Sequence, residues 1–233
     1  MSEGADHDLI SAVRLARADV VRVYALYLSA LAAVPNPAAV RPDEPGFFDT
    51  VFDDGGEILG LEADGVLIAY GVIRPELARE HDRVGLEGIV APDARLWVLD
   101  GSAVHPAWWR HGFQRTIIKA RLARLGELLG AAAGHAIAKA SPGNLPSLRN
   151  LLKCGFVTVE MIEKPYGWRY VQYRPVDAPV SQPSGGRWIN AGAVEDASAR
   201  FARGEVANAC HGEGLAAELR FVAMPGLRAA SGG

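Results

Sequence analysis

The chain has 233 residues, a formal net charge of −3 and a pI near 6.1, and 49% of its residues are apolar. Such a chain can bury one sizeable core, and its slight acidity excludes general nucleic-acid binding, which needs a strongly basic surface. Arginine outnumbers lysine, and Ala and Gly are frequent, which is typical of a GC-rich bacterial genome.

Signals for export, membrane insertion and metal binding are not apparent. Met1 to His7 is polar and acidic and does not resemble a signal peptide. No run approaches the ~18 apolar residues of a membrane span. Cys154 and Cys210 do not form a disulfide framework, and no Cys/His spacing resembles a zinc site. We therefore predict a cytoplasmic protein with reduced thiols, without metal and without membrane or nucleic-acid partners.

Hydrophobic periodicity predicts strands and helices in the first part of the chain. Asp64–Gly65 between two alternating runs is a strong hairpin signal. The run at Ile10–Ala16 alternates like a strand, although a helix also fits it. The expected elements are a strand at Ile10–Ala16, a helix capped by Asp19, a Pro-rich loop at Val34–Pro45, a short helix at Gly46–Asp53 and strands at Glu57–Leu61 and Gly65–Ile73.

The middle of the chain also contains predicted strands and helices. They follow a polar segment, Arg74–Asp93, that is hard to interpret. Asp100–Gly101 marks a turn or a bulge within a strand. Asn144 is an N-cap, and Gly155 is a suitable residue to end the same helix. The expected elements are a strand at Arg95–Val104, a helix at Gly112–Leu129, a buried strand at His135–Ala140, a helix from Asn144 to Gly155 and an antiparallel pair at Phe156–Glu163 and Trp168–Tyr173.

The composition changes to Pro, Ser and Gly between Asp177 and Gly186, which predicts a boundary. We predict a domain at residues 1–176, a linker at 177–186 and a C-terminal extension of unknown role at 187–233. The extension contains a helix-like piece, Val194–Ala209, and an apolar piece, Leu215–Met224. It packs on the main body or on a second subunit, and the sequence leaves both alternatives open.

The segment Val104–Arg115 can bind an anion, because a strand that runs into a helix leaves the first helical N–H groups without intrahelical partners. Gly112 removes a side chain where phosphate oxygens would approach the backbone, and Arg110 and Arg115 can add charge-assisted hydrogen bonds. His111 lies in the same loop. A solvated helix start explains the segment equally well, since short glycine motifs have many false positives.

The run VHPAWWRHGFQRTII resembles the signature of the GNAT superfamily of N-acetyltransferases, in which a strand ends in Val-His-Pro and a Gln/Arg-x-x-Gly-x-Gly/Ala loop opens the next helix. Trp109 stands where Gln or Arg is usual, and Gln114 stands where Gly or Ala is usual. The Gln114 side chain must turn away from the phosphate if its N–H is to donate. The matching residues are Val104, His105, Pro106, Gly112 and Arg115.

A second run, NLPSLRNLLKCGF, resembles the later Asn-x-x-Ala/Ser…Lys-x-Gly-Phe element of the same family. In that family the Asn side chain reaches the pantetheine arm or the nucleotide end of the cofactor. Asn144 and Gly155 also act as helix caps, and both roles can coexist. The resemblance covers roughly Ile10 to Val176, and the matching residues are Asn144, Ser147, Lys153, Gly155 and Phe156.

The resemblance implies an α/β (α+β) GNAT fold, with a central mixed, mostly antiparallel twisted sheet that is flanked by helices and splayed at the acyl-CoA site. It implies an N-acetyltransferase that uses acetyl-CoA, or another acyl-CoA, as co-substrate. A small-molecule or peptide amine would attack the thioester directly. Members of this fold are often dimers, so the sequence leaves the choice between a monomer and a homodimer open. The implied cofactor-binding residues are Ala103, Val104, His105, Arg110, His111, Gly112, Phe113, Gln114, Arg115, Asn144 and Ser147.

The catalytic base is less clear from the sequence. Asp100 is the first candidate, because it lies in the strand that leads to Val104, where some members of this family carry an acid that works through water. Asp-Gly is also a turn signal, so Asp100 can simply cap that turn. Glu87 is a second candidate, whereas His105 belongs to the motif and is expected to be structural.

The family's general acid is often a Tyr one turn before the Lys-x-Gly-Phe, and Leu151 occupies that position. Tyr166, Tyr170 or Tyr173 could substitute, although packed strand aromatics are the simpler interpretation. This departure leaves a non-catalytic acyl-CoA-binding module or sensor as the alternative to the enzyme. An acyl-amino-acid synthase of the same fold, using longer acyl chains, is a third interpretation.

Overall fold

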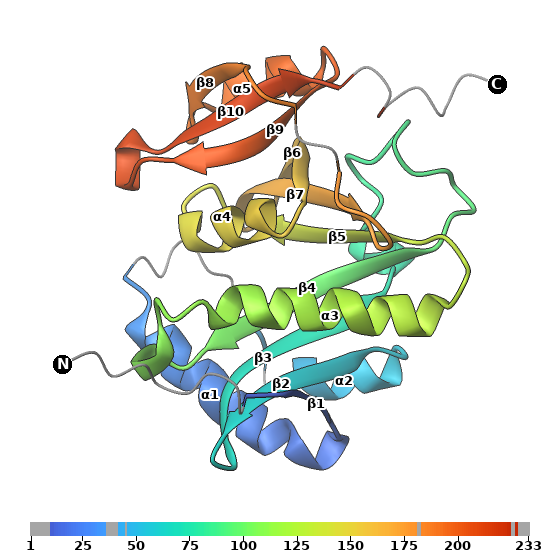
Figure 1. Cartoon of the computed structure of the whole chain (residues 1–233), viewed down its shortest axis with the longest axis vertical. Coiled ribbons are helices and arrows are strands. Elements are labelled where there is room, and N and C mark those ends of the chain that lie inside the picture. Colours follow the sequence, from blue (N-terminus) through green and yellow to red (C-terminus); the bar gives the residue numbers. More distant parts are fainter. Residues whose placement is uncertain (1–9, 36–41, 45, 181–182, 225–226, 228–233) are drawn as a thin grey trace.

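The computed structural model describes residues 10–35, 42–44, 46–180, 183–224 and 227, and these form one ten-stranded sheet with helices on its two faces (Figure 1). The strand order is β1-β2-β3-β4-β5-β7-β6-β9-β10-β8, and β4–β5 is the one parallel pair in it. The predicted mixed, mostly antiparallel sheet is therefore confirmed. The elements are β1 (Ala12–Leu15), α1 (Val20–Ala33), α2 (Phe47–Asp53), β2 (Glu57–Ala63), β3 (Val66–Pro75), β4 (Leu96–Val104), α3 (Phe113–Leu129), β5 (His135–Ala140), α4 (Leu145–Lys153), β6 (Val157–Lys164), β7 (Gly167–Pro175), β8 (Arg187–Asn190), α5 (Val194–Phe201), β9 (Glu205–His211) and β10 (Glu218–Ala223).

The first three strands form an antiparallel meander. Asp64 and Gly65 take φ values of 49° and 75°, so both central residues of the predicted hairpin turn are left-handed. The segment at Ile10–Ala16 forms the edge strand β1 and not a helix. Helices α1 and α2 pack on one face of this meander through Val23, Phe48 and other apolar residues.

Helices α3 and α4 lie side by side on the opposite face, in front of the sheet in Figure 1. The predicted apolar stripe of α3, which includes Ile118, Leu122 and Leu125, packs on the alanines of β5 and on Leu151 of α4. The segment Arg74–Asp93, which the sequence left uninterpreted, completes β3 and then runs as turns. Its Leu86 and Val90 are buried against β4, β5 and β7, so this loop covers sheet surface that no helix covers in the described chain.

The C-terminal extension continues the same sheet. Strand β9 pairs with β6 at Thr158 and Ala207, and α5 packs beside α4 in a shared apolar cluster. The buried hydroxyl of Tyr170 donates a 2.6 Å hydrogen bond to the carbonyl of Ala191. Of the two alternatives for the extension, packing on the main body is confirmed.

The helix predicted at Val194–Ala209 is correct only to Phe201. Gly204 takes φ 76°, which ends the helical path, and the following residues alternate in and out as strand β9. In the predicted linker, Val180 is buried and its N–H donates to the carbonyl of Gly155. One sheet includes strands on both sides of the predicted linker at residues 177–186. The division of the chain into a domain and an extension therefore stays a prediction.

Among the described residues, none of the helices combines the length and the apolar character that a membrane span needs. Cys154 and Cys210 are free thiols, one buried and one half-buried. Met1 to His7, which does not resemble a signal peptide in sequence, lies outside the described residues, as does part of the Pro-rich loop.

Candidate functional site

Strands β4 and β5 diverge in the middle of the sheet. Their parallel register joins Leu96–Val98 to His135–Ile137, and both strands continue beyond it, β4 as far as Val104. The second half of β4 therefore presents backbone groups toward the opening and not toward a strand partner. This opening lies at the end of the sheet where α3 and α4 both begin (Figure 1).

A β-bulge marks the point of divergence. Asp100 and Gly101 of β4 together oppose the single residue Val72 of β3, which confirms a bulge as one of the two predicted interpretations. Arg121 of α3 donates to the carbonyl of Val72 at 3.2 Å and to that of Asp100 at 3.0 Å. Arg121 is buried, and burial lowers its pKa to about 10. An arginine from α3, the helix that follows β4, therefore stabilises the bulge through both of its strands.

The loop from His105 to Gly112 is fixed by its own side chains. His105 Nδ1 accepts from the N–H of Ala107 at 3.3 Å, which agrees with the predicted structural role. Trp109 Nε1 donates to the carbonyl of Val104 at 2.7 Å, so this departure from the motif ties the loop to β4. Arg110 and Gly112 take φ values of 70° and 88°, and α3 begins at the next residue.

Gln114 occupies the position where a small residue was expected. Its Nε2 donates to Ser102 Oγ of β4 at 3.0 Å, so the side chain is turned toward the strand, as phosphate binding at this turn requires. Arg115 and His111 are exposed, and Arg115 Nη2 lies 3.4 Å from where a Cβ on Gly112 would be. The predicted loop residues thus surround one open helix N-terminus.

The remaining predicted cofactor residues lie around the same opening. Asn144 Oδ1 accepts from the N–H of Ser147 at 3.2 Å, so the N-cap role is confirmed and its cofactor contact stays a prediction. Ala103 packs toward the α1 side of the sheet, whereas Val104 and Phe113 are buried on the α3 side. These three can offer the opening only backbone groups.

The hydroxyls that could replace the missing Tyr are engaged elsewhere. Leu151 is buried between α3 and α4. Tyr170 bonds to Ala191 in the extension, and Tyr173 bonds to Nδ1 of His135 at 3.0 Å. Burial raises the pKa of Tyr173 to about 12 and raises that of Tyr170 further. Both therefore act as structural residues, while Tyr166 lies half-exposed in the β6–β7 turn beneath Arg169.

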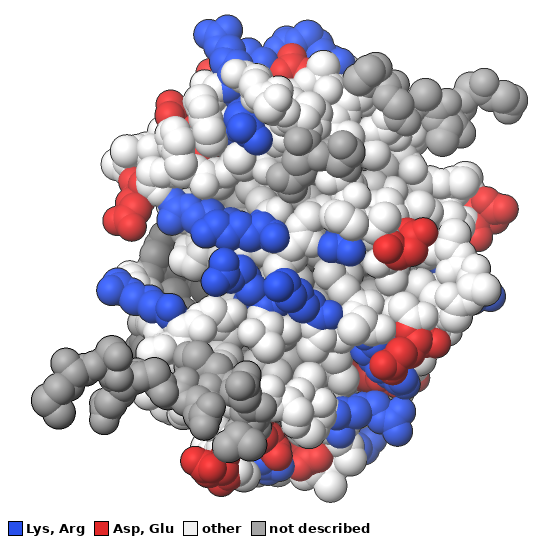
Figure 2. Space-filling model, viewed as in Figure 1, with Lys and Arg blue, Asp and Glu red and all other residues white. Residues whose placement is uncertain are grey.

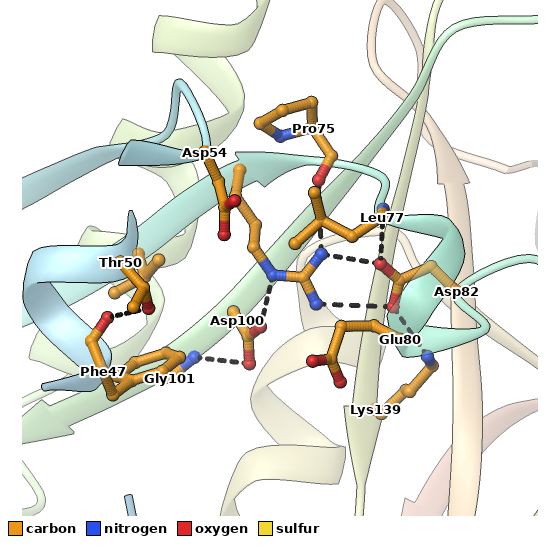
Figure 3. A network of polar contacts seen from close by, with 12 residues as sticks. Phe47, Thr50, Asp54, Pro75, Leu77, Glu80, Asp82, Asp100, Gly101 and Lys139 are labelled. Carbon is orange, nitrogen blue, oxygen red and sulfur yellow. Dashed lines mark hydrogen bonds and ion pairs between the residues drawn. The ribbon is translucent and has the colours of Figure 1, made fainter. Parts of the chain in front are cut away.

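A network of charges lies on the opposite face of β4 (Figure 3). Arg74 Nε donates to Asp100 at 2.7 Å, and its Nη1 donates to Asp82 at 2.6 Å. Lys139 Nζ completes the network with a 2.8 Å bond to the other oxygen of Asp82. Two cations and two carboxylates thus neutralise one another. The side chain of Asp100 is the most exposed of the four, at 34%.

The network decides the charge state of its buried members. Burial alone raises the pKa of Asp82, but Arg74 and Lys139 outweigh it and hold that pKa below its usual value. Burial likewise disfavours the charged form of Arg74, yet its two carboxylates raise its pKa. Arg74, Asp82 and Lys139 were not among the predicted site residues, although a charged residue within an otherwise apolar strand, as at Arg74 and Lys139, indicates a buried ion pair.

The surroundings of Asp100 complete this face. One carboxylate oxygen of Asp100 accepts from the N–H of Gly101 at 3.0 Å. A Cβ on Gly101 would lie 3.4 Å from the Phe47 ring and 3.5 Å from Asp43 Oδ2. The segment containing Asp43 is fixed by a 2.7 Å bond from its N–H to Tyr27. The other predicted base, Glu87, instead accepts from the N–H of Gly85 within its own loop.

The arrangement can therefore hold two reactants on one strand. The α3 side offers a helix N-terminus, arginines and a strand backbone that lacks a neighbouring strand, which suit a phosphorylated thioester. The opposite side offers the carboxylates of Asp100 and Asp43 next to Gly101, and these suit an amine. The described residues contain no cluster of three or more His, Cys, Asp or Glu that could hold a metal ion.

Comparisons with known proteins agree with this geometry. Residues 20–156 match the sequence profile of the acetyltransferase (GNAT) family. No curated protein gave a match. NAA60 of Arabidopsis thaliana, solved with acetyl-CoA, is 15% identical and has a TM-score of 0.56, over 72% of this chain and 99% of that one.

Two further solved structures share the fold. The ribosomal-protein-S18-alanine N-acetyltransferase from Escherichia coli is 14% identical, with a TM-score of 0.51 over 77% of this chain and 100% of that one. AAC(6')-Ib, solved with ribostamycin and coenzyme A, is 13% identical, with a TM-score of 0.50 over 75% of this chain and 99% of that one. At these identities the three structures are evidence for the fold.

Proposed function

Because this chain belongs to the acetyltransferase (GNAT) family, we propose that it transfers an acetyl group from acetyl-CoA to a primary amine by direct attack on the thioester. The observation that carries the proposal is the divergence of β4 from β5 next to an open helix N-terminus. Acetyl-CoA supplies the activated acyl group, and the chain supplies the binding groups and the path for the proton.

The residues on the α3 side fit such a co-substrate. Gly112 is left-handed, and among the described residues a Cβ placed on it would have only Arg115 Nη2 within 4 Å, at 3.4 Å. The dipole of α3 and the charges of Arg110 and Arg115 favour a pyrophosphate there. Backbone N–H groups of β4 beyond the bulge would donate to the thioester oxygen as negative charge develops on it.

The residues on the opposite face fit a protonated amine. Asp100 and Asp43 flank Gly101, and Asp100 is anchored by Arg74 at 2.7 Å. We assign Asp100 the role of accepting the amine's proton, directly or through one water. The attacking nitrogen forms the new amide bond and gives its second proton to water, the C–S bond breaks, and the thiolate of coenzyme A leaves. Water is the proton source for that thiolate, because Tyr170 and Tyr173 are engaged elsewhere and the Tyr166 ring lies against Arg169 in the β6–β7 turn.

One experiment separates the enzyme from its alternative. The melting temperature is measured with and without acetyl-CoA, and thiol release is then followed with a panel of small-molecule and peptide amines. We expect acetyl-CoA to stabilise the wild type but not Gly112→Glu, and at least one amine to release thiol. Stabilisation without thiol release for any amine would favour the acyl-CoA sensor, which the buried Leu151 supports. No stabilisation by any acyl-CoA would overturn the proposal.

A further inference from the structure

The two sides of β4 differ in the charge that they present to a ligand. Lys and Arg side chains gather over α3 and α4 (Figure 2). On the α1 side, the carboxylate of Asp100 accepts from the N–H of Gly101, and a Cβ on Gly101 would lie 3.5 Å from Asp43 Oδ2. The α1 side of the strand therefore favours a cationic ligand, whereas the α3 side favours an anionic one.

Tyr70 of β3 adds a hydroxyl group to the α1 side. The β3–β4 register sets Tyr70 opposite Ala103, and both residues pack in the same apolar cluster. The Tyr70 ring meets Phe48 edge-on, with the ring centroids 5.4 Å apart. Phe48 contacts Phe47 at a centroid distance of 5.2 Å, and a Cβ on Gly101 would lie 3.4 Å from Phe47. Aromatic rings from β3 and α2 are therefore continuous from Tyr70 to Gly101.

The Tyr70 hydroxyl lacks the partner that the other buried tyrosine hydroxyls have. Tyr27 accepts from a backbone N–H, Tyr170 donates to a carbonyl, and Tyr173 bonds to a histidine. Tyr70 is 1% exposed, yet its hydroxyl has no hydrogen-bond partner among the described residues. Because buried polar groups are normally satisfied, this hydroxyl indicates a partner that is not part of the chain.

A ligand can reach the Tyr70 hydroxyl. Its oxygen is not among the fully enclosed polar atoms that lack a partner in the described chain, so it keeps a small accessible surface. Burial raises the pKa of Tyr70 well above its ordinary value, and the nearby charges of Asp43 and Asp100 add to that rise. The hydroxyl is therefore neutral near neutral pH and lies close to both carboxylates, where its oxygen can accept a hydrogen bond from a nitrogen.

We propose that the Tyr70 hydroxyl binds the acceptor amine beside Asp100, by accepting a hydrogen bond from its nitrogen, and that it thereby selects primary amines. This inference rests on the proposed function, in which Asp100 accepts the first proton of the amine and water takes the second. In that function coenzyme A lies on the α3 side, so Tyr70 meets the amine and not the departing thiolate.

The selection of primary amines follows from counting protons. A primary ammonium group has three N–H bonds, of which the first gives its proton to Asp100 and the second to water. The third remains as the N–H of the amide product, and Tyr70 can hold it from substrate binding to the end of the reaction. An N-methyl amine has no third N–H, so the Tyr70 oxygen would lose its donor as the amide forms.

The test is steady-state kinetics of Tyr70→Phe at saturating acetyl-CoA, with the primary amine that releases thiol fastest from the wild type. We expect KM for the amine to rise about tenfold, as for the loss of a hydrogen bond to a charged group, and kcat to stay within about threefold. The Kd for acetyl-CoA should stay within about twofold. Tyr173→Phe, which removes the buried hydroxyl that bonds to His135, is the matched control and should leave KM unchanged.

Two further measurements separate substrate binding from a structural role. The preference in kcat/KM for the primary amine over its N-methyl derivative should fall about tenfold in Tyr70→Phe and stay constant in Tyr173→Phe. The ligand-free melting temperature of Tyr70→Phe should be unchanged or higher, because the lost hydroxyl has no partner, whereas that of Tyr173→Phe should fall.

The outcomes distinguish this inference from the proposed function. An unchanged KM for the amine, an unchanged preference for the primary amine or a lower ligand-free melting temperature in Tyr70→Phe would overturn the inference alone. No thiol release from the wild type with any amine would overturn the proposed acetyl transfer and this inference with it.

Discussion

The two faces of β4 use charge in opposite ways. On the α1 side, Arg74 and Asp82 are 7% and 1% exposed in their side chains and neutralise each other within 2.6 Å. On the α3 side, Arg115, Lys119 and Lys153 are exposed and have no ion pair in the described chain. Charges that are buried and paired determine the structure around the site, whereas charges without a partner remain available to a ligand. Four predictions test this contrast.

The largest expected effect is on folding, at the paired face. Arg74→Met leaves Asp82 buried with only Lys139 as counter-charge, so we expect the free energy of unfolding to fall by about 3–5 kcal/mol. Lys119→Met, on the unpaired face, should change it by less than about 0.5 kcal/mol. Urea denaturation of both variants measures the difference. Similar losses in the two would contradict the contrast.

The next largest effect is expected on the rate of catalysis and not on the binding of acetyl-CoA. Asp100→Asn removes the proposed proton acceptor, so kcat should fall by about 100-fold. Because Asp100 faces away from α3, the Kd for acetyl-CoA should stay within about twofold. Asp93→Asn, exposed before β4, provides the control. A large loss of acetyl-CoA binding in Asp100→Asn would show instead that this carboxylate maintains the bulge.

A smaller effect is expected in the pH dependence of stability. The pKa of Asp82 is lower in the folded protein than in the unfolded chain, where it is about 3.9. Its ion pairs therefore stabilise the fold above that unfolded value, and this contribution is lost as the pH falls through the folded pKa. The wild type should lose more unfolding free energy between pH 5 and pH 3 than Arg74→Met. Parallel pH profiles would argue against the network as the cause.

The smallest effect is expected on the folding stability that α3 contributes. Gly126 lies inside α3, and a Cβ there would meet no other described residue within 4 Å. Gly126→Ala should therefore stabilise the fold by about 0.5–1 kcal/mol and leave the Kd for acetyl-CoA unchanged. A change in that Kd would mean that the stability of α3, and not the residues at its N-terminus, governs the binding of acetyl-CoA.

The same contrast explains what the sequence could predict. The α3-side elements are encoded locally: Gly112 and the residues around it form one loop, and Asn144 and Gly155 cap one helix. Turn residues and periodicity report such features directly. The hairpin at Asp64–Gly65 was predictable for the same reason.

The α1-side network was not predictable in this way. Arg74, Asp82 and Lys139 belong to β3, a loop and β5, and only the packed sheet brings them together. Similarly, the helix predicted at Val194–Ala209 included the first part of β9, because the pairing of this strand with β10 and with Thr158 of β6 decides its conformation more than local propensity does. Contacts between residues far apart in the sequence, and not local composition, therefore determine the structure of the charge network and of β9.

The glycine beneath Arg121 has a consequence for how this sequence can evolve. A Cβ on Gly71 would lie 2.7 Å from Arg121 Nε. Conversely, losing Arg121 leaves the carbonyls of Val72 and Asp100 without their donor. Neither position can change first without cost, so we expect Gly71 and Arg121 to be inherited together. In homologues, this pair of residues, 50 positions apart, should serve as a marker for the same arginine-supported bulge.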